Sequence, residues 1–350
     1  MSPDGESAPD KFRILCVDGG GIRGLISALV IARIEGLLRE RDGDGARISQ
    51  YFHLLAGTST GGLIALALTR REAPSADQLA GFYTEDGPDI FDRSLAWKLR
   101  SGWGTLAPKY SGEALDEAVR KRLEGWRLAD ATRDLVVTAY DMTNRKPFFF
   151  KRWKAQESEA ENFPIATAAL STAAAPTYFP SQTVDGRALV DGGVFAANPT
   201  IAAIAEALGR EQDPPAQPTL EEMLVVSIGT GEFSEGFAPG DVHDWGTLDW
   251  IRPRSGNEPP ILSAMLGGSS DGTDYWAHML LNHAPGKGRP KAEEIGRGKR
   301  YYRFQVRLAN AIEMDDASPA TLGKLQQLAE ELIAERNTEI EEIVARLQRI

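Results

Sequence analysis

The segment YFHLLAGTSTGGLIALALTR, residues 51–70, contains the pattern that decides the fold. Its first six residues are an apolar run of strand length, and its last nine have the spacing of a buried helix. Between them, GTSTG at residues 57–61 fits the sequence G-x-S-x-G, which places a serine on a sharp strand-to-helix turn. Gly57 and Gly61 are needed because side chains there would clash with neighbouring backbone. The segment therefore predicts a strand, a strained turn that exposes Ser59, and a helix.

Apolar runs of similar length recur along the chain and alternate with helical patterns. The runs lie at residues 12–17, 135–139, 148–150, 188–190, 224–228 and 301–306, and the helical patterns at 25–41, 112–123 and 200–208. Strands that are apolar throughout belong to sheets covered by helices on both faces, and such sheets are largely parallel. We therefore predict an α/β fold with a mainly parallel central sheet. Leucines and isoleucines after residue 320 recur with helical spacing, which predicts a terminal amphipathic helix packed on this body.

The composition places further limits on the protein. Its 350 residues include 39 Lys or Arg and 50 Asp or Glu, a net charge of −11 that excludes a general attraction to a nucleic acid duplex. The one cysteine, Cys16, cannot form an internal disulfide bond, and no apolar run is long enough to span a bilayer. The first ten residues lack the pattern of a secretory signal. We therefore expect a cytoplasmic protein.

A glycine-rich turn follows the first apolar run. Residues 18–24 read DGGGIRG and lead into a helical pattern, so Gly19, Gly21 and Gly24 fit G-x-G-x-x-G, the sequence of a dinucleotide-binding turn. That interpretation requires an acidic residue at the tip of the next strand, where this chain has GTSTG. The lysine of a phosphate-binding P-loop is absent as well. The backbone N–H groups of Gly19, Gly20 and Gly21 can instead face the negatively charged oxygen of a reaction intermediate.

A serine nucleophile needs a partner that takes its proton. No histidine lies in a recognisable catalytic loop; the four are His53, His243, His278 and His283. Asp191 follows the apolar run 188–190 and precedes Gly192 and Gly193, which places a carboxylate at the tip of a strand. Partial burial there would raise its pKa and allow it to take the proton of Ser59 directly. The alternative is that Asp191 only caps a turn, since Asp-Gly is common in turns.

Other features leave alternatives open. Arg23 can hold the glycine-rich turn, attract an anionic head group, or be a solvated surface charge. Residues 268–272, GSSDG, also fit G-x-S-x-G, but they follow a helical pattern and no strand, so we reject them on context. Aromatic residues at 81–110 and 233–260 can pack under long loops or contact a bilayer surface. The sequence contains no metal-binding spacing, so neither a metal nor a cofactor is predicted.

Together these motifs resemble the patatin-like phospholipase family, which includes the plant tuber patatins and bacterial relatives. Three ordered motifs within a collinear framework are far more specific than any one of them. The resemblance covers about residues 12–320 and rests on six stretches in the same order, namely residues 18–24, 57–61, 171–176 (STAAAP), 191–193, 227–231 (SIGTG) and 313–318 (EMDDAS).

The resemblance implies a three-layer α/β/α fold with a Ser–Asp dyad. Ser59 would be the nucleophile and Asp191 the proton acceptor, and the amides of Gly19, Gly20 and Gly21 would form the oxyanion hole. The implied enzyme is a serine carboxylic-ester hydrolase of the phospholipase A or lysophospholipase type, which cleaves fatty-acyl esters of membrane glycerolipids through an acyl-enzyme without a cofactor. The positions that would support the motifs are Asp18, Arg23, Gly24, Gly57, Gly61, Gly192 and Gly193.

The resemblance also implies an organisation and a set of partners. Residues 1–11 would be a flexible N-terminus, 12–320 the catalytic domain, and 321–350 a helix packed on it. The enzyme would act on glycerophospholipid or another acyl lipid during transient contact of a cytoplasmic protein with a membrane surface. Three alternatives stay open: activation by a cyclic nucleotide as in bacterial antiphage effectors, a nucleotide-binding module that uses residues 19–24, and a storage or scaffold protein without turnover.

Overall fold

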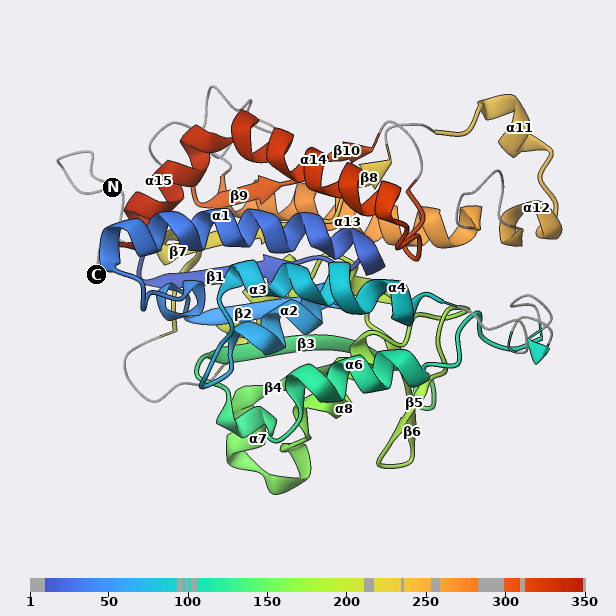
Figure 1. Cartoon of the computed structure of the whole chain (residues 1–350), viewed down its shortest axis with the longest axis horizontal. Helices are drawn as coiled ribbons and strands as arrows, with labels where there is room; N and C mark the ends of the chain where they lie inside the picture. Colours follow the sequence, from blue (N-terminus) through green and yellow to red (C-terminus); the bar gives the residue numbers. More distant parts are fainter. Residues whose placement is uncertain are drawn as a thin grey trace.

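The computed structural model of the chain describes residues 10–92, 97, 100–101, 106–210, 217–233, 236–252, 259–282, 299–308 and 312–348. Most of the expected N-terminal segment, residues 1–11, lies outside them. A central eight-stranded sheet (Figure 1) consists of β1 (Phe12–Val17), β2 (Leu54–Thr58), β3 (Asp134–Asp141), β4 (Lys146–Lys151), β5 (Gln182–Val184), β6 (Arg187–Asp191), β7 (Met223–Ile228) and β9 (Tyr301–Phe304). A separate pair of short strands is formed by β8 (Glu232–Phe233) and β10 (Arg307–Leu308).

The core of the sheet is parallel. The strands β3, β2, β1, β7 and β9 are neighbours in this order, and each pair of neighbours runs in the same direction. Antiparallel pairing is confined to one side of the sheet, where β4 and β6 pair with β3, and β5 pairs with β6. Parallel neighbours need crossover connections, which the intervening helices supply. The mainly parallel sheet predicted from the apolar runs is therefore confirmed.

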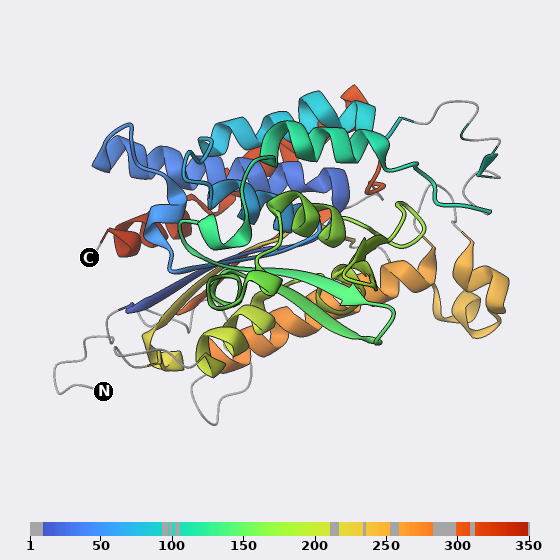
Figure 2. The same ribbon diagram turned by 90° about the horizontal axis from the view of Figure 1, so that it is seen from below.

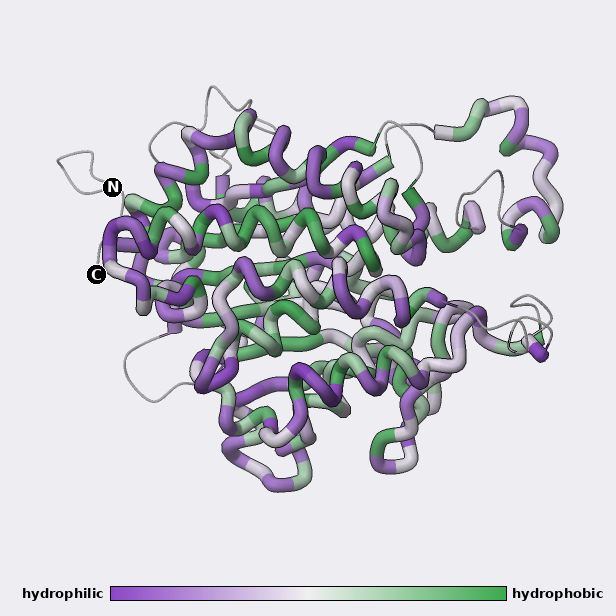
Figure 3. Tube along the Cα trace, in the orientation of Figure 1, coloured by the Kyte–Doolittle hydropathy of each residue, from purple (hydrophilic) through white to green (hydrophobic). Residues whose placement is uncertain are grey.

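Helices cover both faces of this sheet and make three layers (Figure 2). Successive side chains of a strand point to opposite faces, so Leu15 and Val17 pack into one hydrophobic core and Ile14 and Cys16 into another. Figure 3 shows hydrophobic residues in the central strands and along the helices that cover them. The predicted α/β/α fold is confirmed. The first core lies under α1 (Gly24–Asp42), α2 (Thr60–Leu68), α3 (Ala76–Gly81), α6 (Glu113–Leu123), α8 (Ile165–Thr172), α14 (Pro319–Glu335) and α15 (Asn337–Leu347), the second under α10 (Thr200–Gly209) and α13 (Pro260–Leu281).

Several shorter helices complete the described part of the chain. None of the described helices combines the length and the apolar composition that crossing a lipid bilayer requires. The shorter ones are the π-helical turn Phe82–Asp86, α4 (Gly87–Ile90), α7 (Arg152–Glu157), α9 (Gly193–Ala196), α11 (Pro239–His243) and α12 (Thr247–Ile251).

The pairing around β3 brings two distant parts of the chain together. β4 occupies one edge of β3 over its last six residues, so β2 and β6 share the other edge. On that edge Thr58, the last residue of β2, lies opposite Thr138, and Asp191, the last residue of β6, lies opposite Ala139. Since β2 and β6 run in opposite directions, their carboxyl ends meet. Ser59, which follows β2, is thereby placed beside Asp191.

The C-terminal segment differs from the single helix expected over residues 321–350. It forms two helices, α14 and α15, with a bend at Arg336. The bend allows both apolar stripes to be buried, because α14 and α15 each pack on α1. At the bend, Arg336 Nη2 donates to the backbone oxygen of Arg303 at 3.3 Å. Near the end of α15, the backbone oxygen of Leu347 accepts from Arg13 Nη1 at 2.7 Å, which ties the segment to β1.

Candidate active site

Ser59 lies where β2 turns into α2. Its backbone angles, φ 54° and ψ −125°, fall outside the regions that residues with a side chain normally adopt, so the turn is strained. A Cβ on Gly57 would lie 2.2 Å from the Gly61 carbonyl oxygen, and one on Gly61 would lie 2.1 Å from the Val17 carbonyl oxygen. The Ser59 amide donates to Thr172 Oγ1 at 2.8 Å, a contact that the sequence analysis missed although Thr172 belongs to the STAAAP stretch. The predicted strand–turn–helix is therefore present.

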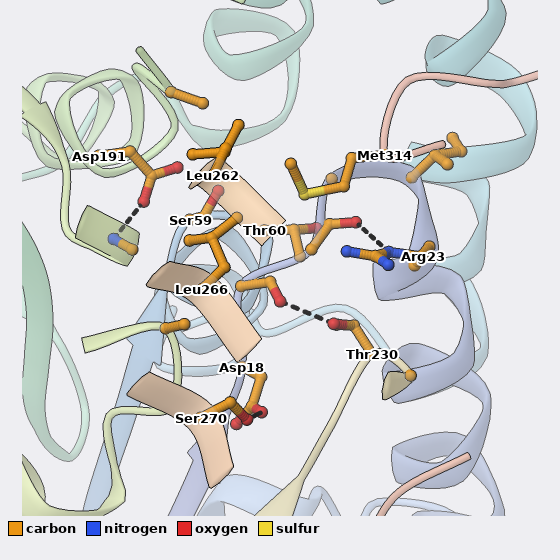
Figure 4. A pocket seen from close by; sticks show the side chains of 18 of the residues that line it. Asp18, Arg23, Ser59, Thr60, Asp191, Thr230, Leu262, Leu266, Ser270 and Met314 are labelled. Carbon is orange, nitrogen blue, oxygen red and sulfur yellow. Dashed lines mark hydrogen bonds between the residues drawn. The ribbon is translucent and has the colours of Figure 1, made fainter. Parts of the chain in front are cut away.

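Asp191 lies beside Ser59, and the two side chains point toward each other (Figure 4). Asp191 is only 5% exposed, and its carboxylate accepts from the Gly193 amide at 2.7 Å. Burial raises the pKa of Asp191 to about 7, although the interactions of the carboxylate with the Ser59 side chain and the Gly193 amide lower it. A Cβ on Gly192 would lie 2.1 Å from Thr138 Oγ1, so glycine is required at this approach of β6 to β3. The two predicted site residues thus lie side by side and line one pocket.

The glycine-rich turn after β1 passes beside this pair. The Gly19 amide donates to the Ala197 carbonyl oxygen at 2.9 Å, which makes it unavailable to an oxyanion. The amides of Gly20 and Gly21 have no acceptor within the described part of the chain. Gly19 is therefore removed from the three predicted oxyanion amides, because the residue after α9 accepts its hydrogen bond, and the amides of Gly20 and Gly21 stay available. Gly19 instead provides space, since a Cβ there would lie 3.2 Å from Ser59 Cβ.

Two distant segments hold the turn in place. Thr230, which follows β7, donates from Oγ1 to the Gly19 carbonyl oxygen at 2.6 Å. A Cβ on Gly20 would lie 2.2 Å from Thr230 Oγ1, so the turn accepts only glycine there. On the other side, the Ile22 amide donates to the Met314 carbonyl oxygen at 2.8 Å. The SIGTG and EMDDAS stretches of the sequence therefore act as the walls of this turn.

Behind the turn, Asp18 forms a buried ion pair that the sequence analysis missed. Arg303 of β9 donates from Nη1 to Asp18 Oδ1 at 3.0 Å and from Nη2 to Oδ2 at 2.6 Å. The same guanidinium donates to Ser227 Oγ at 3.0 Å and to Ser270 Oγ at 3.2 Å. Two signals could have indicated this network: a charged residue inside the apolar run 301–306, and the serine of the rejected GSSDG stretch. Ser270 belongs to the support of the site and not to a second serine turn.

Arg23 is buried, which excludes a role as a solvated surface charge. Its Nε donates to the Gly20 carbonyl oxygen at 3.3 Å, and its guanidinium lies 5.1 Å from the centre of the Phe233 ring. Of the alternatives left open by the sequence, holding the turn is the one that these contacts support. A Cβ on Gly24 would lie 2.4 Å from Thr60 Oγ1, so the glycine allows α1 to begin directly against α2.

A pocket of ≈ 390 Å³ opens in front of Ser59, Asp191 and the glycine-rich turn. Figure 4 shows Leu262 and Leu266 of α13 close to Ser59. A mainly apolar lining with a few polar groups at one end is typical of sites that bind apolar ligands. Several of the aromatic residues whose role the sequence left open take part in this lining, whereas Trp103 lies outside the described residues. The apolar lining includes Leu63, Phe82, Tyr83, Ile90, Phe91, Leu115, Tyr178, Phe179, Phe233, Phe237 and Met314.

No histidine of the described ranges lines this pocket. His53 precedes β2, at the opposite end of the strand from Ser59. His278 lies on α13 and His243 ends α11, and neither contacts the pair of site residues. His283 lies outside the described residues. Within the ranges that the structure describes, no cluster of three or more His, Cys, Asp or Glu side chains could hold a metal ion.

Sequence comparisons relate this chain to a known protein family. Residues 15–204 match the family model described as patatin-like phospholipase. Patatin-like protein 2 of Oryza sativa subsp. indica is 33% identical in an alignment of 367 positions that covers 95% of this chain and 87% of the relative. Patatin-like protein 2 of Arabidopsis thaliana is 35% identical in an alignment of 289 positions that covers 75% of this chain and 70% of the relative. The crystal structure of VipD from Legionella pneumophila aligns with 93% of this chain and 68% of its own, at 13% identity and a TM-score of 0.35. The chain belongs to the patatin-like phospholipase family.

Proposed function

We propose that this protein hydrolyses fatty-acyl esters of glycerolipids, with Ser59 as the nucleophile and Asp191 as the proton acceptor. The observation that carries the proposal is that Ser59 faces a buried carboxylate, Asp191, whose pKa is raised by burial to about 7. Membership of the patatin-like phospholipase family supports a lipid acyl hydrolase. The apolar pocket in front of the pair has the lining that an acyl chain requires.

In the proposed reaction, Ser59 Oγ attacks the ester carbonyl carbon while Asp191 takes the hydroxyl proton. The carbonyl oxygen becomes negatively charged and accepts hydrogen bonds from the amides of Gly20 and Gly21, close to the N-terminus of α2. The ester C–O bond then breaks, and the alcohol leaves with the proton from Asp191. A water molecule attacks the acyl-enzyme, Asp191 accepts its proton and returns one to Ser59, and the fatty acid is released. The arrangement supports a phospholipase A or lysophospholipase activity on glycerophospholipids.

Two substitutions test the chemistry on a soluble nitrophenyl ester. Ser59→Ala and Asp191→Asn should each lower kcat by at least about a thousandfold, because each removes a group that acts in the transition state. A fluorophosphonate probe should label Ser59, as mapped by mass spectrometry, and leave Ser270 unlabelled. As a matched control, a variant with His53, His243, His278 and His283 all replaced should keep its turnover. Loss of activity through one of these histidines in a folded protein would contradict the proposed dyad.

The physiological substrate needs a mixed lipid extract. Incubation with the parent protein and with Ser59→Ala should release free fatty acids only with the parent, and the lipids that decrease identify the head group and the ester position. The other interpretations of the sequence give different results in these assays. A nucleotide-binding module would be stabilised by dinucleotides and would not be labelled at Ser59. An effector activated by cyclic di- or trinucleotides would hydrolyse lipid only after one of them was added, and a storage protein would not hydrolyse it at all.

A further inference from the structure

Exposed large apolar side chains gather at one end of the molecule. α11 and α12 lie beyond the start of α13, at the end farthest from both termini (Figures 1 and 2). A folded surface normally exposes large apolar residues singly, and a group of them marks an interaction site. Here five exposed side chains come from α12, the start of α13 and the segment before α11. We call them the mouth face: Phe237, Leu248, Ile251, Ile261 and Met265.

The mouth face continues the lining of the pocket. Phe237 is exposed and also lines the pocket. On α13, Leu262 and Leu266 line the pocket, whereas Ile261 and Met265 are exposed. Residues four apart share one side of a helix, so one turn of α13 presents one apolar stripe to the pocket and another to the outside. A lipid with its acyl chain in the pocket would therefore have its remaining parts beside the mouth face.

The mouth face is supported from within. α12 packs on α13. The Trp245 ring lies edge-on to those of Phe237 and Trp250, with centres 4.8 Å and 5.2 Å apart. These internal contacts hold the segment together without covering Leu248 and Ile251, which stay exposed. The apolar side chains are thus presented outward by a packed aromatic cluster.

The charges around the mouth face decide which surface suits it. Residues 236–252 contain three aspartates and one arginine, and residues 259–268 contain no charged residue. Attraction to anionic lipid requires clustered Lys or Arg, and the chain as a whole carries a net charge of −11. Burial of apolar side chains in the interface of a bilayer requires no such cluster. The local composition therefore favours a surface without net charge.

We propose that the mouth face docks on a zwitterionic phospholipid bilayer by inserting its apolar side chains, so that the pocket opens directly onto the lipid. The choice of a lipid surface rests on the proposed acyl hydrolysis, because that substrate lies in a bilayer. Docking would place the mouth of the pocket at the depth where acyl esters lie, just below the head groups. Attachment would depend on buried apolar area and not on ionic attraction.

The test uses the full chain with Ser59→Ala, so that binding is measured without hydrolysis. Co-sedimentation with phosphatidylcholine vesicles should show binding, and adding Leu248→Ser with Met265→Ser should weaken it at least about tenfold through the lost apolar area. The matched control is Leu280→Ser with Met142→Ser, because these side chains are 48% and 55% exposed against 54% and 51% in the test pair. The control pair should bind like its parent.

Three further measurements complete the test. In chains with Ser59 intact, Leu248→Ser with Met265→Ser should leave hydrolysis of a soluble short ester unchanged, since neither residue lines the pocket, and should reduce hydrolysis of vesicle lipid. Anionic phosphatidylglycerol in the vesicles should not strengthen binding, and salt should not release the protein.

Binding that requires anionic lipid, or equal binding by the test and control pairs, would overturn the proposal. So would a dimer in solution that the test pair dissociates, because the mouth face would then cover a second copy. If Ser59 proves unreactive but the vesicle results hold, the docking surface stands and the proposed activity falls.

Discussion

In the proposed reaction, Asp191 has to be ionised before it can accept the proton of Ser59. Burial raises the pKa of Asp191 to about 7, so the active fraction falls about tenfold for each pH unit below that value. We expect kcat/KM on a soluble ester to rise with pH, to level off above about pH 7, and to report one apparent pKa near that value. A profile that stays flat from about pH 5 to about pH 8 would show that this carboxylate is not the group that accepts the proton.

The same residue should make the folded protein sensitive to alkali. A carboxyl group whose pKa is raised by folding binds its proton more tightly in the native state. Its contribution to stability is complete below about pH 4 and is lost as the pH rises through about 7. Asp191→Asn should therefore increase the free energy of unfolding at about pH 8, by up to roughly 4 kcal/mol, and change it little near pH 4. Urea unfolding at both values would measure this.

An exposed aspartate provides the control for that experiment. Asp44 lies after α1 with its side chain 99% exposed, so Asp44→Asn should have the same small effect at both pH values. If Asp191→Asn destabilises the protein equally at low and high pH, folding does not raise the pKa of the Asp191 carboxyl group.

Backbone strain at Ser59 gives a second effect on stability. Its φ of 54° and ψ of −125° suit glycine better than any residue with a Cβ. Both Ser59→Gly and Ser59→Ala should abolish hydrolysis, but Ser59→Gly should be the more stable of the two by about 1 kcal/mol. Thermal unfolding of the two variants side by side would measure the difference. Equal stability, or a more stable alanine variant, would mean that the turn is not strained.

At the scale of elements, the motifs of the site could be predicted from the sequence but their meeting could not. G-x-S-x-G between an apolar run and a helix predicts the turn at Ser59, and the carboxylate at a strand tip predicts Asp191. Their contact depends on which edge of β3 each of β2 and β6 occupies, and on a register that puts Thr138 and Ala139 opposite their last residues. Register is set by packing across the whole sheet, which local patterns do not record.

The hydrogen bonds that hold the glycine-rich turn could not be predicted from the sequence for a related reason. The Gly19 amide is taken by the Ala197 carbonyl, and Asp18 is paired with Arg303 from β9, 285 positions away. Such contacts between β1 and distant elements follow from the order of strands in the sheet, which the sequence analysis did not predict. The single terminal helix was wrong because a leucine stripe gives the period of a helix and does not show where the helix bends.

The tie between β1 and β9 can be tested directly. Arg303→Met leaves Asp18 buried without its partner and should lower the free energy of unfolding by about 3–5 kcal/mol. Asp18→Asn combined with Arg303→Met should recover part of that loss, because no unpaired charge remains. The exposed pair of Arg120 and Asp116 on α6 is the control, since Arg120→Met should cost less than about 1 kcal/mol. A loss from Arg303→Met as small as that of the control would mean that the ion pair does not hold the two strands.

At the scale of the whole molecule, the layers followed from the sequence. Apolar runs alternating with helical patterns predict a sheet covered on both faces, and the family resemblance gives the same architecture. The position of α13 did not follow from the sequence. This helix covers the second face of the sheet and also reaches the pocket with its first turns, and no local pattern indicates both roles. The outward placement of Leu248 and Ile251 likewise depends on how the short helix α12 packs against α13.

The end-to-end meeting of β2 and β6 has a consequence for synthesis of the protein. A ribosome releases the serine turn long before the aspartate, and Arg303 emerges more than 100 residues later still. A partly made chain would therefore carry Ser59 without the carboxylate of Asp191 beside it, and the glycine-rich turn without Arg303 behind it. By the proposed mechanism, such a chain could not hydrolyse the lipids near the ribosome until the sheet had closed.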